Sequence, residues 1–308
     1  MREAETAEGK GNGRMMDETI ATAAATLKEA GVDTPEHDAK ILLAEAAGCE
    51  LRDVDKAMLM GDGLEYDAAK FDAMIARRAK REPLQYIVGH APFRYLDLQV
   101  GPGVFIPRQE TELVVQEGID WITRNGLYNP HVVDLCAGSG AIGLAIVTEV
   151  QGSHVWGVEI SPQAVAWTRR NIEATMRRWP ALASNYELEI GDATSPTTLD
   201  KLDGTIDMVI TNPPYVPQSD IPAQPEVRDH DPELALYGGS LDGTLIPERI
   251  VRRAAALLKP QGLFVMEHDI SQGDRLAAFA QANGFEQVHI RNDYTGRPRY
   301  LVAVRANG

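Results

Sequence analysis

The sequence predicts an α/β fold, in which a mostly parallel sheet is covered by helices and preceded by a smaller helical domain. From about residue 108 onward, strand and helix patterns alternate, which is typical of a sheet with helices on both faces. Between residues 17 and 82 the apolar residues instead recur at helical spacing. A chain of 308 residues is long enough for one large domain and a smaller companion.

The composition is that of an ordinary globular protein, with 44% hydrophobic and 24% charged residues. Since 30 Lys and Arg stand against 45 Asp and Glu, the net charge is −15. This charge disfavours diffuse binding to a nucleic-acid backbone, and we expect no direct contact with nucleic acid. No apolar run approaches the roughly 20 residues that span a bilayer, so we expect no membrane association.

The two cysteines, Cys49 and Cys136, suggest neither a disulfide framework nor a metal site, and they favour a reducing compartment. The start of the chain is polar and glycine-rich, without the apolar segment of a secretory signal. We expect residues 1–16 to form a disordered tail, with Met15 and Met16 as alternative starts. The protein is expected to be a cytoplasmic monomer without a bound metal.

Apolar periodicity and capping residues define the helical domain, residues 17–82. Three helices are predicted: Asp17–Ala30, closed by Gly31; one that opens at Thr34-Pro35 and ends at Gly48; and Tyr66–Arg81. The third helix ends in Arg77, Arg78, Lys80 and Arg81. The favoured interpretation is a set of solvated cations that stabilise the helix C-terminus. The alternative is a docking patch for an acidic or RNA-rich partner.

Residues 83–107 predict a β-hairpin linker. The apolar stretch Tyr86–Val88 and a second stretch, Phe93–Val100, are separated and followed by glycines. Together they suggest a strand pair that bridges the helical domain and the domain of residues 108–308.

The large domain, residues 108–308, contains seven predicted strands. They are His131–Leu135, His154–Ile160, Tyr186–Ile190, Ile206–Thr211, Gly262–Glu267, Phe285–Arg291 and Arg299–Val304. Helices are predicted over 141–150, from Ser161-Pro162 onward, over about 244–258 and over 271–283. Only a short turn separates the last two strands, so we expect the final strand to pair antiparallel.

A glycine-rich loop, Cys136-Ala137-Gly138-Ser139-Gly140, follows the first of these strands. Glycine lets the backbone approach a ligand and adopt a left-handed turn, and ligands of open α/β sheets lie at the carboxyl ends of the strands. Glu159 ends the second strand, 21 residues after Gly138, where a carboxylate would receive a ribose diol. These features predict an adenosine cofactor. Because the loop also fits G-x-G-x-x-G, NAD and FAD stay open at this point.

Two acids and the antiparallel last strand favour S-adenosyl-L-methionine over a dinucleotide. Asp134, directly before the loop, suits a cationic amino group better than a pyrophosphate. Asp192 and Ala193 follow the third strand, where the acid can accept from an adenine amino group. The fold class predicted is therefore a Rossmann-like class I SAM-dependent methyltransferase sheet of seven strands, the last one antiparallel, with a smaller N-terminal helical domain. Cys136 is interpreted as a packing residue, since no basic neighbour in sequence lowers the pKa of its thiol.

The acceptor motif is Asn212-Pro213-Pro214-Tyr215, directly after the strand Ile206–Thr211. Two prolines fix two φ angles and remove two donors, so the loop is rigid and its carbonyl groups are unpaired. An amide nitrogen is a poor nucleophile that must be held and oriented. The Asn212 side-chain oxygen and the Pro213 carbonyl would accept its N–H groups, while the Tyr215 ring stacks on the planar group. The motif predicts methyl transfer to a planar nitrogen.

From residue 17 onward the chain resembles the release factor glutamine methyltransferases, the PrmC or HemK family. Besides the acceptor motif, the resemblance rests on three segments. They are Pro83-Leu84-Gln85-Tyr86-Ile87-Val88-Gly89; Gly103-Val104-Phe105-Ile106-Pro107-Arg108-Gln109-Glu110-Thr111-Glu112; and Pro225-Glu226-Val227 with Ala235-Leu236-Tyr237-Gly238-Gly239 and Asp242-Gly243.

The resemblance implies N5-methylation of the glutamine in the Gly-Gly-Gln motif of class 1 peptide chain release factors, with the helical domain gripping the body of the factor. It places the cofactor at Cys136, Ala137, Gly138, Ser139, Gly140, Glu159, Asp192, Ala193 and Asn212. It places the glutamine at Asn212, Pro213, Pro214 and Tyr215, with Asn212, Pro213 and Tyr215 as catalytic residues. Two positions depart from the family pattern. Gln109 replaces a proline, and Cys136 replaces a glycine, so we expect the backbone at Cys136 to avoid a strained φ.

Three other functions remain to be compared with this one. An N6-adenine methyltransferase acting on DNA or RNA would use the same acceptor motif, although the charge of −15 argues against it. A non-catalytic partner-binding protein would not need Asn212, Glu159 and the glycine loop together. An NAD-dependent oxidoreductase would account for the glycine-rich loop but not for the other features of the site.

Overall fold

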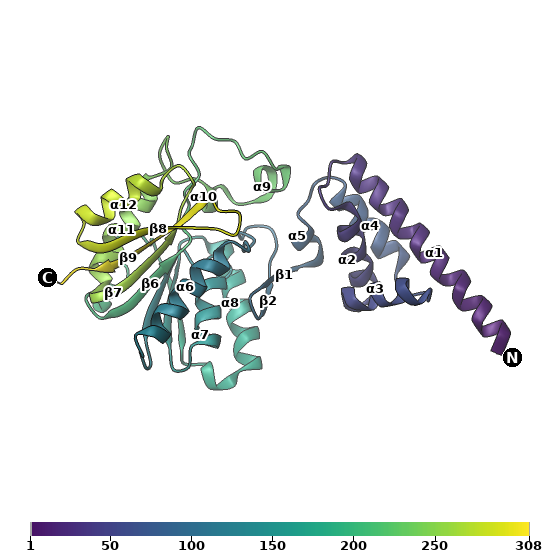
Figure 1. Ribbon diagram of the computed structural model, residues 1–308, viewed down its shortest axis with the longest axis horizontal. Helices are drawn as coiled ribbons and strands as arrows, with labels where there is room; N and C mark the ends of the chain where they lie inside the picture. Colours follow the sequence, from purple (N-terminus) through teal and green to yellow (C-terminus); the bar gives the residue numbers. More distant parts are fainter. Residues whose placement is uncertain (1, 308) are drawn as a thin grey trace. The chain divides into compact units, whose positions relative to one another are not determined.

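The computed structural model describes the backbone of residues 2–307 and the side chains of residues 15–307, and it divides into two compact units (Figure 1). Unit 1 comprises the residues up to Gly89 together with Ala223–His230, and unit 2 comprises the remainder from His90 onward. Within the described residues, no helix is both long and apolar enough to cross a membrane.

Unit 1 is helical, and its core is formed by the apolar faces that the sequence predicts. Its helices are α1 (Arg2–Glu29), α2 (Pro35–Ala47), α3 (Leu51–Met60), α4 (Ala68–Arg78), α5 (Leu84–Val88) and α9 (Pro225–His230). Ile20, Leu27, Leu42 and Leu43 are almost fully buried in one cluster. Gly48 ends α2 in a left-handed conformation, as expected for a glycine cap. Helix α3 is not among the predicted helices.

Helix α1 differs from the prediction of a disordered tail over residues 1–16. The helix begins at Arg2, and Met1 lies outside the described residues. Met16 is buried in the core of unit 1, so the packed part of the helix starts before Asp17. From a packed segment, helix propagation adds one hydrogen bond per residue without a new nucleation cost, and no proline interrupts residues 2–29.

The segment Leu84–Val88 is helix α5 and not part of a strand pair. Leu84, Ile87 and Val88 pack against the unit 1 core, and their spacing of three and four residues fits one helical face. Tertiary packing therefore overrides the β-propensity of the segment. The predicted hairpin is shorter, with β1 (His90–Phe93) paired antiparallel to β2 (Leu96–Gln99).

Of the cations at the end of α4, Arg78 and Arg81 are held in ion pairs and are not solvated, whereas Arg77 and Lys80 are exposed, as the favoured interpretation expects. Arg78 is 6% exposed, and its guanidinium donates to Asp38 and Glu226, each at 2.7 Å. Arg81 donates twice to the same Glu226 carboxylate, at 2.7 and 2.8 Å, while Arg77 pairs with Glu82. Partial burial raises the pKa of Glu226, but the hydrogen bonds from Arg81 and Arg78 outweigh it and lower the pKa to about 2. This network holds α9 within unit 1.

Unit 2 contains the predicted seven-stranded sheet, in the order β5-β4-β3-β6-β7-β9-β8. Its strands are β3 (His131–Leu135), β4 (His154–Glu159), β5 (Tyr186–Ile190), β6 (Ile206–Thr211), β7 (Leu258–Glu267), β8 (Phe285–Asn292) and β9 (Pro298–Arg305). Strands β3 to β7 pair in parallel, and β9 runs antiparallel to both of its neighbours. The prediction of seven strands with an antiparallel last strand is confirmed.

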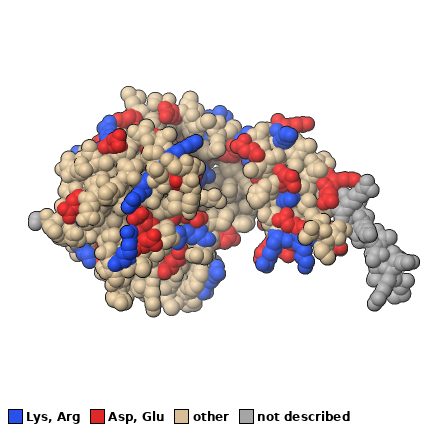
Figure 2. Space-filling view, in the orientation of Figure 1, with Lys and Arg blue, Asp and Glu red and all other residues tan. Residues whose placement is uncertain are grey.

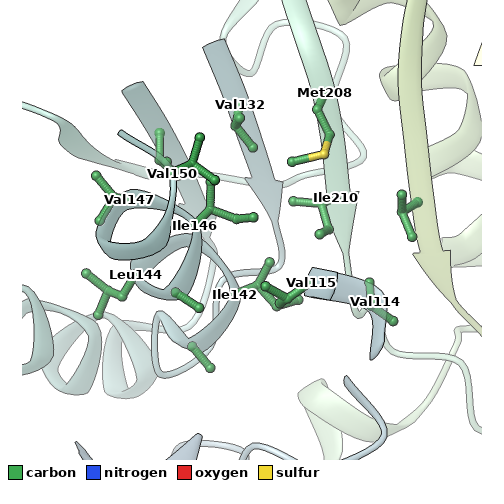
Figure 3. Close-up of a cluster of buried hydrophobic side chains, with 14 of the residues drawn as sticks. Val114, Val115, Val132, Ile142, Leu144, Ile146, Val147, Val150, Met208 and Ile210 are labelled. Carbon is green, nitrogen blue, oxygen red and sulfur yellow. The ribbon is translucent and has the colours of Figure 1, made fainter. Parts of the chain in front are cut away.

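Helices cover both faces of this sheet (Figure 1). They are α6 (Thr111–Arg124), α7 (Ala141–Glu149), α8 (Pro162–Arg178), α11 (Leu245–Leu257) and α12 (Gly273–Ala282). The short helix α10 (Glu233–Leu236) lies at the cavity described below, and short 3₁₀ turns occur at Pro180–Leu182 and Asp200–Leu202. On one face α6 and α7 enclose a cluster in which Ile146 points toward Val132 of the sheet and Ile142 lies beside Val115 (Figure 3). On the other face α11 and α12 pack on Val133 and Val209. Alternate strand residues are thus buried on opposite faces, which fixes the strand register.

The loop after β3 is strained at Cys136, contrary to the expectation that its backbone avoids such a conformation. Cys136 has a φ of +67°, a left-handed value that costs a residue with a Cβ roughly 1–2 kcal/mol. Gly138 and Gly140 also have positive φ. The turn therefore has three left-handed residues at alternate positions, and only two of the three are glycines.

We predict that Cys136→Gly unfolds at a higher urea concentration than Cys136→Ala, by about 1 kcal/mol in the free energy of unfolding. Both substitutions remove the sulfur, but only glycine relieves the left-handed strain. A control is provided by Ala145 in α7, because alanine is more stable than glycine inside a helix. Ala145→Gly should destabilise the chain by about 1 kcal/mol or more. If C136A were the more stable of the pair, the backbone at this position would not be strained.

Candidate active site

The register of the parallel strands brings four loops to one edge of the sheet. The last residue of β3, Leu135, pairs with Thr211 of β6 and Val158 of β4, and Thr211 pairs with Met266 of β7. The Thr211 hydroxyl also donates to the Leu135 carbonyl. Because the chain passes from β5 to β6 across β3 and β4, this edge lies at the topological switch point, where open α/β sheets bind ligands.

A cavity of about 280 Å³ lies at this edge. Most of the predicted site residues line it: Cys136, Ala137, Gly138, Ser139, Glu159, Asp192, Ala193, Asn212, Pro213, Pro214 and Tyr215. Gly140 does not line it. Gly140 has a φ of +85° at the start of α7, where a Cβ would approach Leu144 and Thr168 at 3.1 and 3.2 Å. Its contribution is the turn from the loop into the helix.

Glu159 is the acid at the cofactor side of the cavity. The residue is 8% exposed, and its two carboxylate oxygens accept from the backbone N–H groups of Gly138 and Ser161, at 2.8 and 2.7 Å. Burial raises the pKa of the Glu159 carboxyl, and these backbone donors oppose that rise. Each oxygen keeps a second lone pair, so an oriented carboxylate is available for a vicinal diol.

Asp192 and Ala193 lie beside Glu159, because Ile190 at the end of β5 pairs with Glu159. One Asp192 oxygen accepts from the backbone N–H and the hydroxyl of Thr194, both at 2.8 Å. The acid is therefore held in a turn, with its second oxygen available to a ligand. A carboxylate positioned for a diol, a second for an amino group and a glycine turn between them fit an adenosine cofactor.

Asp134 does not line the cavity, so the prediction that it meets a cationic amino group is wrong. The side chain is fully buried behind the loop, and one oxygen accepts from the Gly143 backbone N–H at 2.9 Å. Burial raises the pKa of Asp134 to about 8, which leaves the carboxyl mostly neutral at pH 7. Asp134 instead joins the end of β3 to the first turn of α7.

Cys136 is unsuited to nucleophilic catalysis, as predicted from the sequence. Burial, with the nearby charges of Glu159 and Asp134, raises the pKa of the Cys136 thiol far above its usual range. The thiolate is the reactive form, so the side chain acts as a packing group. It contacts the apolar cluster below the sheet edge.

The acceptor loop is held by three side chains from other parts of unit 2. The Asn212 amide nitrogen donates to the Thr111 hydroxyl at 3.2 Å, and the Thr111 hydroxyl donates to Glu267 at 2.7 Å. The Tyr215 hydroxyl donates to the other oxygen of Glu267 at 2.9 Å. Gln272 donates to the Tyr215 backbone carbonyl at 2.8 Å. Burial and the Glu267 charge raise the pKa of Tyr215 well above 10, so the phenol stays protonated.

Sequence reasoning assigned no role to Thr111, Glu267 or Gln272. Two signals for them existed. Thr111 lies in the segment Gly103–Glu112 that carries part of the family resemblance, and Glu267 ends a predicted strand at the same edge as Asn212. Gln272 had no such signal, because its contact depends on how the chain turns after β7.

Family models match both units. Residues 18–89 match the model described as the PrmC N-terminal domain, and residues 119–225 match the model described as the methyltransferase small domain. The first match ends at Gly89, the last residue of the first segment of unit 1.

Two curated relatives show the family, and a third is a methyltransferase with a different named activity. A release factor glutamine methyltransferase of Bifidobacterium longum is 68% identical over 94% of this chain and 99% of its own length. That of Streptomyces coelicolor is 43% identical over 93% and 97%. A 4-amino-L-phenylalanine/4-methylamino-L-phenylalanine methyltransferase of Streptomyces pristinaespiralis is 36% identical over 77% of each chain. With matches that span both units, the chain belongs to the release factor glutamine methyltransferase family.

Proposed function

We propose that the protein transfers a methyl group from S-adenosyl-L-methionine to the side-chain nitrogen, N5, of the glutamine in the Gly-Gly-Gln motif of class 1 peptide chain release factors. One observation carries the chemistry: the glycine loop after β3 and the Asn212–Tyr215 loop after β6 line a single cavity. The substrate follows from the family, whose 68% identical member covers unit 1 as well as unit 2.

On the cofactor side, the chain supplies hydrogen bonds and shape. Glu159 would accept both ribose hydroxyls, since its oxygens are already oriented by backbone donors. Asp192 would accept from the adenine amino group, and Cys136 to Gly140 would follow the cofactor with their backbone. When bound, the sulfonium supplies an electrophilic methyl group and a neutral thioether leaving group.

On the acceptor side, the chain holds and orients a weak nucleophile. The glutamine amide would donate its two N–H groups to the Asn212 side-chain oxygen and the Pro213 carbonyl, while the Tyr215 ring stacks on the amide plane. These contacts favour a pyramidal nitrogen with its lone pair directed at the methyl carbon. The new N–C bond forms as the C–S bond breaks, and the electron pair of that bond stays on sulfur. The methylated nitrogen then loses one proton to water.

The partner and setting belong to the same proposal. Unit 1 would bind the body of the release factor, the protein would work as a monomer, and both would meet in the cytoplasm. Unit 1 is matched by the PrmC N-terminal domain model, and its core is independent of the catalytic cavity. These features support a domain for substrate docking and not for chemistry.

Nucleic acid is the less favoured substrate, although adenine also presents an amino group on a planar ring. On the face drawn in Figure 2, Lys and Arg are interspersed with Asp and Glu over unit 2 and form no basic stripe. Together with the net charge of −15, this distribution disfavours contact with a phosphate backbone.

The direct test is transfer of a labelled methyl group from the cofactor to a purified class 1 release factor. We expect labelling of the intact factor and none of a factor whose target glutamine is changed to alanine. Asn212→Ala should lower kcat/KM by about 100-fold, whereas Asn125→Ala, at the exposed end of α6, should change it by less than about twofold. Equal labelling of the two factors would contradict the proposal, and labelling of DNA or RNA would favour an adenine substrate.

Cofactor affinity should depend on pH through Glu159. The ionised carboxylate accepts two hydroxyls, whereas the protonated group offers one oxygen fewer as an acceptor. Since burial raises the pKa of Glu159, affinity should be constant above that pKa and fall as pH decreases through it. Glu159→Gln should bind about tenfold more weakly at pH 7.5.

Calorimetric titration of the wild-type protein and of Glu159→Gln with S-adenosyl-L-methionine, from pH 8 to pH 5, checks this expectation. Titration of the cofactor itself affects both dissociation constants equally and cancels in their ratio. The dissociation constant of Glu159→Gln divided by that of the wild type should decrease as the pH is lowered. A ratio that stayed constant with pH would mean that the Glu159 charge does not contribute to cofactor binding.

A further inference from the structure

Glu267 anchors a short hydrogen-bond chain that ends at the acceptor loop. The chain runs from the Glu267 carboxylate to the Thr111 hydroxyl, at 2.7 Å, and from there to the Asn212 amide, at 3.2 Å. Glu267 is 2% exposed and Thr111 is 3% exposed. The three residues come from β7, the start of α6 and the end of β6.

The direction of this chain follows from the capacity of each group. An ionised carboxylate can only accept, and a threonine hydroxyl has a single proton to donate. That proton is used in the bond to Glu267, so the Thr111 oxygen can only accept on its other side. The group of Asn212 that faces Thr111 must therefore be the NH₂, and the carbonyl oxygen of Asn212 is turned the other way.

We propose that Glu267 acts as a positioning residue, which fixes the direction of the Glu267–Thr111–Asn212 chain and so presents the Asn212 oxygen to the acceptor nitrogen. This inference rests on the proposed function, because it concerns the orientation of the group that receives the acceptor N–H. An Asn212 with its amide reversed would present two N–H donors to the N–H groups of the substrate, and the acceptor would be repelled.

The second oxygen of Glu267 also holds Tyr215, at the other end of the acceptor motif. It accepts from the Tyr215 hydroxyl at 2.9 Å, while Gln272 holds the Tyr215 carbonyl. Asn212 and Tyr215 flank the two prolines. Asn212 is therefore held through Thr111, and Tyr215 directly, by the Glu267 carboxylate. Burial raises the pKa of Glu267, and the two hydroxyl donors and the Arg299 charge act against that rise.

Glu267→Gln, the neutral isostere, shows why the carboxylate determines the direction of the hydrogen-bond chain. In Glu267→Gln one atom of the side chain accepts and the other donates. If its NH₂ faced Thr111, the threonine proton would turn to Asn212 and the asparagine amide would reverse. The variant keeps the volume and the hydrogen-bond number of the site, but it no longer selects one direction.

Neutron diffraction from the full chain, bound to S-adenosylhomocysteine in deuterated crystals, tests the direction without any acceptor substrate. We expect two deuterons on the Asn212 atom that faces Thr111 and the Thr111 deuteron on the line to Glu267. Tyr215→Phe removes the other donor to Glu267 and should leave this arrangement unchanged. Deuterons on the opposite side of Asn212, or a Thr111 hydroxyl directed at Asn212, would overturn the proposal.

A double-mutant cycle then tests whether the direction matters for turnover. Thr111→Val and Glu267→Gln should each lower kcat about 10- to 100-fold, while the Kd of S-adenosylmethionine changes by less than about twofold. Because both act through one chain, the double variant should be no slower than the slower single variant. Thr111→Ser keeps the hydroxyl and should recover most of the activity lost in T111V.

Additive effects, or a Kd that rises in proportion to the fall in kcat, would overturn the positioning role. If the wild-type protein did not methylate the release factor, the proposed function would fail, whereas the neutron map would still decide the direction of the chain.

Discussion

The register of four parallel strands at one edge of the sheet is the constraint on which the site depends. Across β4, β3, β6 and β7 the row of paired residues is Val158, Leu135, Thr211 and Met266. The residue after each of these is Glu159, Cys136, Asn212 or Glu267, so one row of backbone pairing places the ribose acceptor, the glycine loop, the acceptor loop and its anchor side by side. A slip by one residue would turn every side chain to the opposite face.

That register is maintained by packing on both faces of the sheet. Val132 and Met208 are buried on the face covered by α6 and α7, and Val133 and Val209 on the face covered by α11 and α12. A slip by one residue would exchange the side chains that meet the two sets of helices, and the close packing on each face would be lost. The precision of the polar site is therefore a consequence of the apolar core beneath it.

Burial raises the pKa of two acids at this edge, and the two acids differ in the donors that oppose the rise. Asp134 receives one backbone N–H, and its other oxygen has no partner among the described residues. Burial consequently prevails, and its pKa rises to about 8. Glu267 receives two hydroxyls and lies near Arg299, which offset the cost of a buried charge. The first acid supports the loop, and the second orients the acceptor motif.

The fold and the loops of the site could be predicted from the sequence because their signals are local. Seven apolar stretches, the glycines after β3 and the Asn212–Tyr215 motif are each visible within a few residues. Thr111 and Glu267 could not be assigned a role, since their contact joins positions 156 residues apart and exists only in the correct register. The placement of Glu226 beside Arg78 is equally non-local, since the two positions are 148 residues apart.

Three local predictions are wrong. The polar, glycine-rich start is helical and continues a buried helix. Leu84–Val88 is helical because one of its faces joins the core of unit 1, and these tertiary contacts outweigh a β-propensity scale that spans about 1 kcal/mol. Cys136 has a left-handed φ of +67° although it carries a Cβ.

A crystal structure of the full chain with S-adenosylhomocysteine and a class 1 release factor would show whether the row of strand ends aligns an amide nitrogen with the methyl donor. We expect the glutamine nitrogen to lie within hydrogen-bond distance, about 3 Å, of the Asn212 side-chain oxygen and the Pro213 carbonyl, and to face the cofactor sulfur. A glutamine outside the cavity, or one whose carbonyl oxygen faces Asn212, would contradict this expectation.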